Sequence, residues 1–172
     1  MSGTSTVYEN TIAAIFDRLS IFFTEGTLTE LYNDIPAPVL SVGEKASKKP
    51  MSVIIDNMPS KSNAEASDKT IRLSDTFSVH ISIAATDRSK DKARHICLAY
   101  VDCVTNAILA EWSLSGVVER ALPGIESSET ELLSNKDNRA TAVVSIECTV
   151  RGTALAPYKE VLNGSTYKKD IA

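Results

Sequence analysis

The stretch Thr76-Phe77-Ser78-Val79-His80-Ile81-Ser82-Ile83-Ala84 decides the fold of this chain. Large apolar side chains alternate here with serine and histidine, which is the period-two pattern of a strand with one buried face. In residues 140–151 the same alternation returns, with an apolar side chain at every second position from Val144 to Val150. We therefore expect two long strands that turn one face to the core and the other to solvent.

Two amphipathic helices are predicted to cover that sheet. Between residues 5 and 24, apolar side chains recur at steps of three and four and give one broad apolar face. A second helix is expected from Asp87-Arg88-Ser89 to about Trp112, with a stripe that is apolar except at Glu111. The apolar members of the two stripes are Tyr8, Ile12, Ile15, Phe16, Leu19, Phe22 and Phe23, followed by Ala93, Ile96, Cys97, Tyr100, Val104, Ala107 and Ile108.

This order of elements predicts an α+β fold. We expect a two-layer domain with a mainly antiparallel sheet and two long helices packed on one face. The 172 residues suffice for one domain, to which we assign residues 1–152. Residues 153–172 are expected to form an extended C-terminal arm, because Pro157 and Gly164 interrupt regular structure there.

Two polar stretches are predicted to be loops. Residues 34–50 hold Pro36, Pro38 and Pro50 together with several charged side chains, so we expect a long solvated connector of about fifteen residues. Residues 59–68 are predicted to be a second polar loop. Shorter strands are predicted at residues 53–55 and 117–122 and, with a loop, within residues 126–138.

The composition excludes several classes of function. Eighteen basic and twenty-two acidic residues give a net charge of −4, which is not that of a basic nucleic-acid binder. No apolar stretch approaches the ~20 residues that a membrane span needs, and the first residues lack the pattern of a signal peptide. Three cysteines without a CxxC pair indicate reduced, buried thiols and a cytosolic origin.

No pattern in the sequence supports catalysis. The chain has no GxGxxG, phosphate-loop, GxSxG or HExxH motif, and its two histidines are too few for a three-histidine metal site. His80 is predicted on the polar side of its strand and His95 on a helix surface, while Glu126, Glu129 and Glu131 are predicted to form a solvated edge. We therefore expect no catalytic, cofactor-binding or metal-binding residue, and no enzyme activity.

One local charge pattern is unusual. Arg88, Lys90, Lys92 and Arg94 fall in the first turns of the second helix, where the helix dipole favours anions. A solvated helix face is the simpler explanation, and a positive patch that contacts an acidic partner surface is the functional one. The other residues that we expect at a subunit or partner interface are Lys45, Lys48 and Lys49 of the connector and Tyr158 and Tyr167 of the arm.

In order and spacing, this pattern resembles the tail terminator (tail completion) proteins of long-tailed bacteriophages. The resemblance covers roughly residues 6–152: the N-terminal helix, the loop, and the alternating strand Phe77-Ser78-Val79-His80-Ile81-Ser82-Ile83. The turn Asp87-Arg88-Ser89 follows, and then the helix that contains Ala93-Arg94-His95-Ile96-Cys97-Leu98-Ala99-Tyr100. Its last parts are Leu114-Ser115-Gly116-Val117 and the closing strand Val143-Val144-Ser145-Ile146-Glu147-Cys148-Thr149-Val150-Arg151-Gly152.

The resemblance implies a structural virion protein without a cofactor. In that family a ring, usually of six subunits, caps the head-proximal end of the tail tube, stops tube polymerisation and offers a surface for head–tail joining. The implied partners are further copies of the chain, the tail tube protein, the head connector or neck protein and, in a contractile tail, the sheath. DNA would pass through the lumen without specific binding, and the virion would be assembled in the host cytoplasm, with no role for a membrane.

Two alternatives stay open at this point. The chain could be another neck or head-completion subunit, which would share the assembly role but not the position on the tube. It could instead be a small cytosolic α+β domain that binds a metabolite or a regulatory partner. A monomer with a closed, well-shaped pocket would favour this last alternative.

Overall fold

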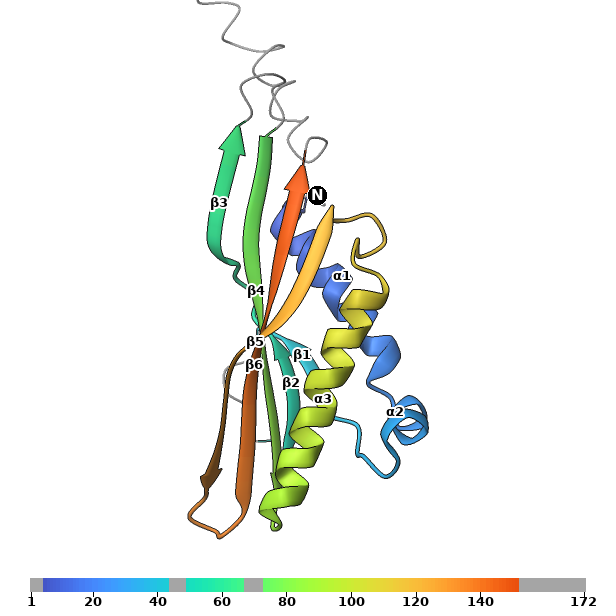
Figure 1. Ribbon diagram of the computed structural model, residues 1–172, viewed down its shortest axis with the longest axis vertical. Helices are drawn as coiled ribbons and strands as arrows, with labels where there is room; N and C mark the ends of the chain where they lie inside the picture. The colour runs from blue at the N-terminus through green and yellow to red at the C-terminus, as the bar shows by residue number, and fades with distance from the viewer. Residues whose placement is uncertain (1–4, 44–48, 67–72, 152–172) are drawn as a thin grey trace, which may run out of the picture.

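A computed structural model describes residues 5–43, 49–66 and 73–151. Within these residues the chain forms three helices and one six-stranded sheet, which confirms the predicted α+β class. Figure 1 shows the helices gathered on one side of a strongly twisted sheet. In chain order the elements are α1 (Val7–Phe22), α2 (Glu25–Tyr32), β1 (Val39–Val42), β2 (Met51–Ile55), β3 (Ser60–Ala66), β4 (Leu73–Asp87), α3 (Lys90–Ala110), β5 (Arg120–Leu132) and β6 (Asn138–Arg151).

The sheet is mixed but mostly antiparallel, with the strand order β1-β2-β4-β6-β5. β4 and β6 are antiparallel partners from Ser74 opposite Arg151 to Asp87 opposite Asn138. Along its other edge β4 pairs first with β3 and then with β2. Among the described strands, only β1 and β2 run parallel. The two long strands predicted from the alternating pattern are therefore confirmed, and they pair with each other.

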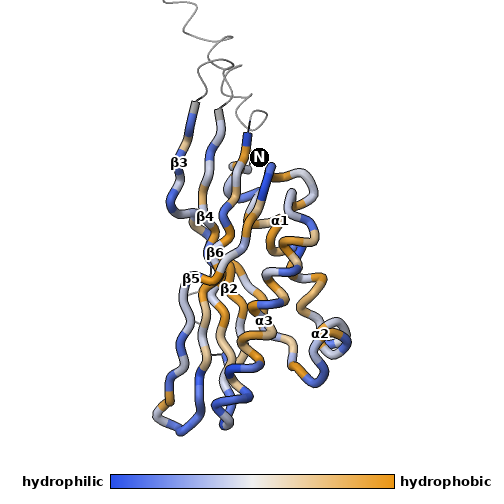
Figure 2. Tube along the Cα trace, viewed as in Figure 1, coloured by the Kyte–Doolittle hydropathy of each residue, from blue (hydrophilic) through white to orange (hydrophobic). Residues whose placement is uncertain are grey.

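The core lies between the helices and one face of the sheet. α3 packs against β4, β5 and β6, and the side chains of Phe77, Val79, Ile81 and Ile83 on that face are at most 1% exposed. Figure 2 shows the hydrophobic residues concentrated there, while hydrophilic residues dominate the lower ends of β5 and β6 and the start of α3. We call the opposite face of the sheet, which carries Ser78, the outer face. All apolar members of both predicted helix stripes are buried or partly buried.

α1 lies beside α3 at the β1 edge of the sheet. It begins with a capping box: Thr6 Oγ1 accepts a hydrogen bond from the Glu9 N–H at 3.1 Å, and the Glu9 carboxylate accepts one from the Thr6 N–H at 2.7 Å. The hydroxyl of Tyr8 donates to Asp75 Oδ2 at 2.6 Å, which ties the start of α1 to β4. The sheet is thus covered directly by α3, and α1 extends the helical layer sideways.

The helix predicted for residues 5–24 is shorter than expected. It ends at Phe22, and Thr24 begins a separate helix, α2, by accepting a hydrogen bond from the Thr27 N–H at 3.3 Å. α2 has eight residues and a single buried side chain, Leu28. The apolar pattern does not predict α2, because one buried position gives no periodicity.

Two stretches predicted as loops each contain a strand. Within residues 34–50 the chain forms β1, which pairs in parallel with β2, with Leu40 opposite Val53 in the register. Within residues 59–68 it forms β3, although that strand is polar, because β4 extends far enough to offer it a backbone partner. Both are edge strands, so pairing on one side determines their structure more than hydrophobic alternation does.

β5 also differs from the prediction. It runs without a break through Pro123-Gly124, and a register shift between Ile125 and Ser127 places an extra residue in the strand. Pro123 is tolerated because β5 lies at the edge of the sheet, where one side of the backbone needs no hydrogen-bond donor. The strand does not begin at Val117, which instead lies in a turn with left-handed backbone angles from Leu114 to Gly116.

Candidate functional site

The basic residues predicted to contact a partner lie in part at the start of α3. Arg88, Lys90, Lys92 and Arg94 are all exposed there. Arg94 Nη2 lies 3.7 Å from Asp91 Oδ1, one turn away, which is a weak exposed pair. Most of this positive charge therefore faces solvent, as a contact surface for an acidic partner would require.

Lys49 lies at the same end of the sheet. It is exposed, and the carbonyl of the next residue, Pro50, accepts a hydrogen bond from the Thr86 N–H at 2.8 Å. Because Arg88 follows Thr86 by two positions, the connector and the start of α3 meet here. We call Lys49, Arg88, Lys90, Lys92 and Arg94 together the basic end. The other predicted interface residues, Lys45, Lys48, Tyr158 and Tyr167, lie outside the described residues.

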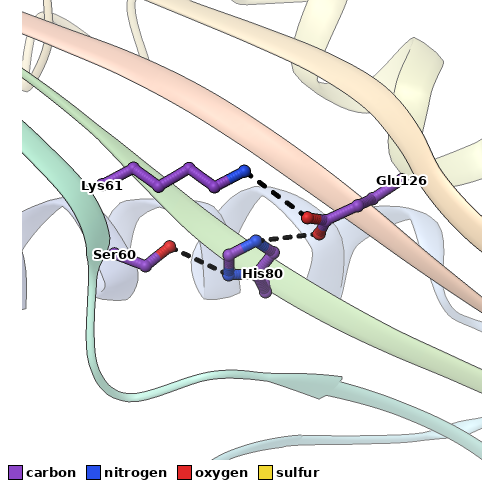
Figure 3. Close-up of polar contacts among 4 residues, drawn as sticks. All are labelled: Ser60, Lys61, His80 and Glu126. Atoms are coloured by element: carbon purple, nitrogen blue, oxygen red, sulfur yellow. Dashed lines mark hydrogen bonds and ion pairs between the residues drawn. The ribbon is translucent and has the colours of Figure 1, made fainter.

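A polar cluster lies on the outer face of the sheet (Figure 3). His80 Nε2 is 2.9 Å from Glu126 Oε2, and His80 Nδ1 is 3.2 Å from Ser60 Oγ. Lys61 Nζ lies 3.6 Å from the other carboxylate oxygen of Glu126. Glu126 is exposed on the edge strand β5, as predicted, but it also forms ion pairs, and His80, whose side chain is 20% exposed, is held from both sides. The prediction missed this cluster because its members come from three strands that the sequence does not place together.

The cluster has the residue types of a nucleophile, a base and an acid. Acyl transfer requires a cavity for the substrate beside the serine, with donors for the developing oxyanion. None of Ser60, His80 and Glu126 lines the cavities described below. The cluster joins β3, β4 and β5 by side-chain contacts, and the contact between β4 and β5 passes over β6, which lies between them.

A groove of about 720 Å³ lies between α1 and β1, and we call it the α1–β1 groove. Its walls are mainly apolar: Ile12 and Phe16 of α1 face Leu40 and Val42 of β1. Ser41 also lines it, and the buried Oγ of Ser41 has no hydrogen-bond partner in the described part of the chain. The groove thus combines an apolar floor with the carboxylates of Glu9 and Asp17 and an adjoining strand edge.

A smaller cavity of about 250 Å³ lies near the start of β5. Trp112, which is 60% exposed, lines it together with Arg120 and Arg151. Arg151 Nε is 3.0 Å from Glu119 Oε2, so one of the two guanidinium groups is paired locally. Exposed tryptophan and arginine are the residue types enriched at the energetic centres of protein interfaces.

The three cysteines offer no reactive thiolate. All are free and buried. Burial raises the pKa of Cys97 and Cys103 to about 11 each and that of Cys148 to about 12, because the interior disfavours the charged form. The predicted buried thiols are confirmed. Since the nucleophile is the thiolate, these side chains act as small apolar residues at neutral pH.

Two further properties of the described residues concern metal binding and membrane crossing. In residues 5–43, 49–66 and 73–151, no group of three or more histidine, cysteine, aspartate or glutamate side chains is arranged to hold a metal ion. None of the helices in that part of the chain has the length and apolar character needed to cross a bilayer.

Comparison with known proteins gives similarities to solved structures only. No protein-family model matches the sequence, and no curated protein matches it. Among solved structures, the chain is similar to one from the virion of a native gene transfer agent particle, with a TM-score of 0.38 and 15% sequence identity. The alignment covers 82% of this chain and 94% of that chain. A function for this protein therefore has to be argued from its own residues.

Proposed function

We propose that this protein is a tail terminator: copies of the chain form a ring, of six subunits in that family, that caps the head-proximal end of a tail tube. The ring stops tube polymerisation and offers the surface on which the head connector or neck protein docks. The chain is a structural component and not an enzyme. Its place is the tail and neck of the virion, after assembly in the host cytoplasm.

The observation that carries this proposal is that the sheet has unlike open edges, with β1 and β5 at the two ends of the strand order and β3 as a third edge strand beside β4. β1 is the last strand on one side and β5 on the other, and neither has a second strand partner among the described residues. The β1 edge is uncharged, whereas β5 carries Glu126, Glu129 and Glu131. Contacts between two unlike surfaces of the same chain are head-to-tail, and such contacts form a ring when the rotation between copies closes.

The order of elements gives further support. The sequence resemblance depends on an N-terminal helix, a long alternating strand, a second helix and a long closing strand, and α1, β4, α3 and β6 occur in that order. The exposed basic end and the cavity beside Trp112 are surfaces for the other proposed partners, the tail tube protein and the connector. In a contractile tail, the sheath would be one more partner.

The charge of the ring fits a passage for DNA. Six copies at −4 each carry −24, so the assembly as a whole repels phosphate. A lumen lined with lysine and arginine would bind the backbone of DNA and slow its exit. We therefore place acidic or neutral side chains at the lumen, and Lys90, Lys92 and Arg94 on the outside or against acidic residues of a neighbour.

Electron microscopy of the purified protein tests this proposal, alone and mixed with tail tubes. The expected result is a closed ring that also sits on one end of each tube and prevents its further growth. A matched sample with tubes only shows how far they extend without the protein. A monomer at all concentrations, with and without tubes, would overturn the proposal.

A second candidate, a small ligand-binding domain, is favoured by the α1–β1 groove alone. Its volume of about 720 Å³ is within the range of small-molecule sites. Native mass spectrometry of freshly purified protein separates the two candidates. A monomer with a bound metabolite supports the ligand-binding domain, and a ligand-free oligomer supports the ring.

A further inference from the structure

We propose that the ring is joined by strand addition: β5 of one copy pairs with the open edge of β1 in the next copy and fills its α1–β1 groove. This inference rests on the proposed function, since it names the contact that would hold the subunits together. The occupant of the groove is thus a second copy of this chain.

The open edge of β1 is unusual because, in the part of the chain that the structure describes, neither a charged residue nor proline on the strand guards it. Exposed edge strands normally carry charged residues or proline, which prevent pairing with other chains. β3 has Lys61 and Glu65, and β5 has Pro123 and Glu129. β1 has the sequence Val-Leu-Ser-Val, with Val39 and Val42 about 40% exposed. An unprotected apolar edge beside an apolar groove is a site for one further strand.

The second half of β5 has matching side chains. Ser128 and Thr130 lie opposite the buried Ala142 and Ala140, so they and Leu132 are on the helix side of the sheet. Leu132 is 71% exposed, which is a large exposed fraction for an apolar side chain of its size. All three residues are uncharged, and a β5 strand added to β1 would direct them toward the groove.

The acidic residues of β5 point the other way. Glu129 and Glu131 pair with Thr141 and Arg139 of β6 and are therefore on the outer face. In the proposed contact their carboxylates stay outside the groove. Ser41 is on the outer face of β1, where it is the partner of Ile54. Its buried hydroxyl would then find a carboxylate or hydroxyl acceptor on the added strand.

The directions of the strands also agree. β1 is parallel to β2, and antiparallel steps then lead from β2 through β4 and β6 to β5, so β1 and β5 run in opposite directions. A ring repeats the sheet in the same sense, so these two strands meet antiparallel. The Gly43 N–H donates to Ile55 O at 2.9 Å, and by alternation the Val42 N–H points to the open edge.

Two variants block one side of this contact each. Val42→Lys places a charge on the β1 edge, and Leu132→Lys places one on the β5 face that would enter the groove. Each is expected to weaken self-association about tenfold or more, because burying the lysine ammonium at the contact costs more than the carboxylates of Glu9 and Asp17 at the groove return. Ile21→Lys is the matched control, since Ile21 is 61% exposed on α1 and does not line the groove. Circular dichroism and thermal unfolding check that all three variants fold.

Mixing the two blocked variants is the decisive step. Val42→Lys retains an intact β5 and Leu132→Lys an intact β1, so the mixture is expected to form a one-to-one dimer while each variant alone stays monomeric. Native mass spectrometry with one variant isotope-labelled reads this out. If Leu132→Lys alone formed a dimer, the contact would join two β1 edges and the inference would be wrong.

The same experiment separates this inference from the proposed function. If the wild-type protein forms rings or caps tubes and both variants do so equally well, the inference fails and the tail terminator proposal stands. If the wild-type protein is a monomer under all conditions, with and without tubes, both fail. Loss of assembly in the two edge variants, with Ile21→Lys unaffected and the mixed dimer formed, supports both.

Discussion

His80 of β4 contacts Glu126 of β5 over an intervening strand, with Nε2 and Oε2 2.9 Å apart. β6 lies between these two strands and contributes no side chain to the drawn contacts (Figure 3). Glu126 reaches His80 because the register shift after Ile125 places it as an extra residue in β5. Since Ser60 of β3 binds the other side of the imidazole, the cluster links side chains of three strands on the outer face of the sheet.

The first prediction concerns Glu126→Gln. This change removes the charge that His80 and Lys61 share but retains a side chain of the same shape. We expect the free energy of unfolding to fall by about 0.5–1.5 kcal/mol, because the contact is partly exposed and screened. Urea unfolding measures this, with Glu129→Gln as the control on the same strand. Equal effects of both variants would mean that the cluster contributes no specific stability.

The second prediction concerns pH and the three buried thiols. Their raised pKa values, about 11 for Cys97 and Cys103 and about 12 for Cys148, mean that the folded state retains protons which the unfolded state loses above its ordinary value of 9.0. The thiols therefore contribute stability that is fully present below pH 9 and is lost as the pH rises toward 11–12.

Two measurements check this. Unfolding free energies should decrease between pH 9 and pH 11, and the decrease should be smaller in Cys97→Ala, which removes one of the groups. At pH 8 the native protein should react with iodoacetamide far more slowly than the urea-unfolded protein does. Rapid modification of the native thiols would show that they are accessible, contrary to their burial.

Whether an element of the fold could be predicted from the sequence depends on how clear its local hydrophobic pattern is. The strands around Phe77 and Ile146 and the helix around Ile96 were predictable, because one-sided burial leaves a clear periodicity in the sequence. β1 and β3 were not, since an edge strand gains its structure from a distant backbone partner. The cluster around His80 was not predictable for the same reason, because its contacts depend on sheet order and on a register shift that no local pattern indicates.

The third prediction concerns the two arms. Deleting residues 153–172 is expected to leave the free energy of unfolding unchanged and to weaken assembly, because the sequence of this arm has no periodic apolar pattern of its own. The structure changes the expectation for residues 34–50. Ile35 is buried and the Tyr100 hydroxyl donates to the carbonyl of Pro36, so shortening this whole connector should destabilise the core.

Thermal unfolding and analytical ultracentrifugation of each deletion variant measure the two effects separately. In the connector, removing residues 44–48 takes away no described strand and no described core residue. That shorter deletion is the matched control, and it should retain stability. If removal of residues 153–172 lowers the melting temperature, the arm belongs to the core.

The last prediction concerns Lys90 and Lys92 at the start of α3. Both are exposed next to a helix N-terminus, where the dipole disfavours positive charge. The double change Lys90→Glu and Lys92→Glu should therefore raise the melting temperature slightly. It should at the same time weaken assembly about tenfold at low salt, if these lysines contact acidic residues of a neighbour. The double variant Lys90→Gln and Lys92→Gln should lie between the wild-type protein and the glutamate variant, both in melting temperature and in strength of assembly. A structural role alone would move stability and assembly in the same direction, so opposite changes identify a contact surface.

Assembly of the wild-type ring should also weaken with added salt, and low salt should reveal no tight binding of DNA.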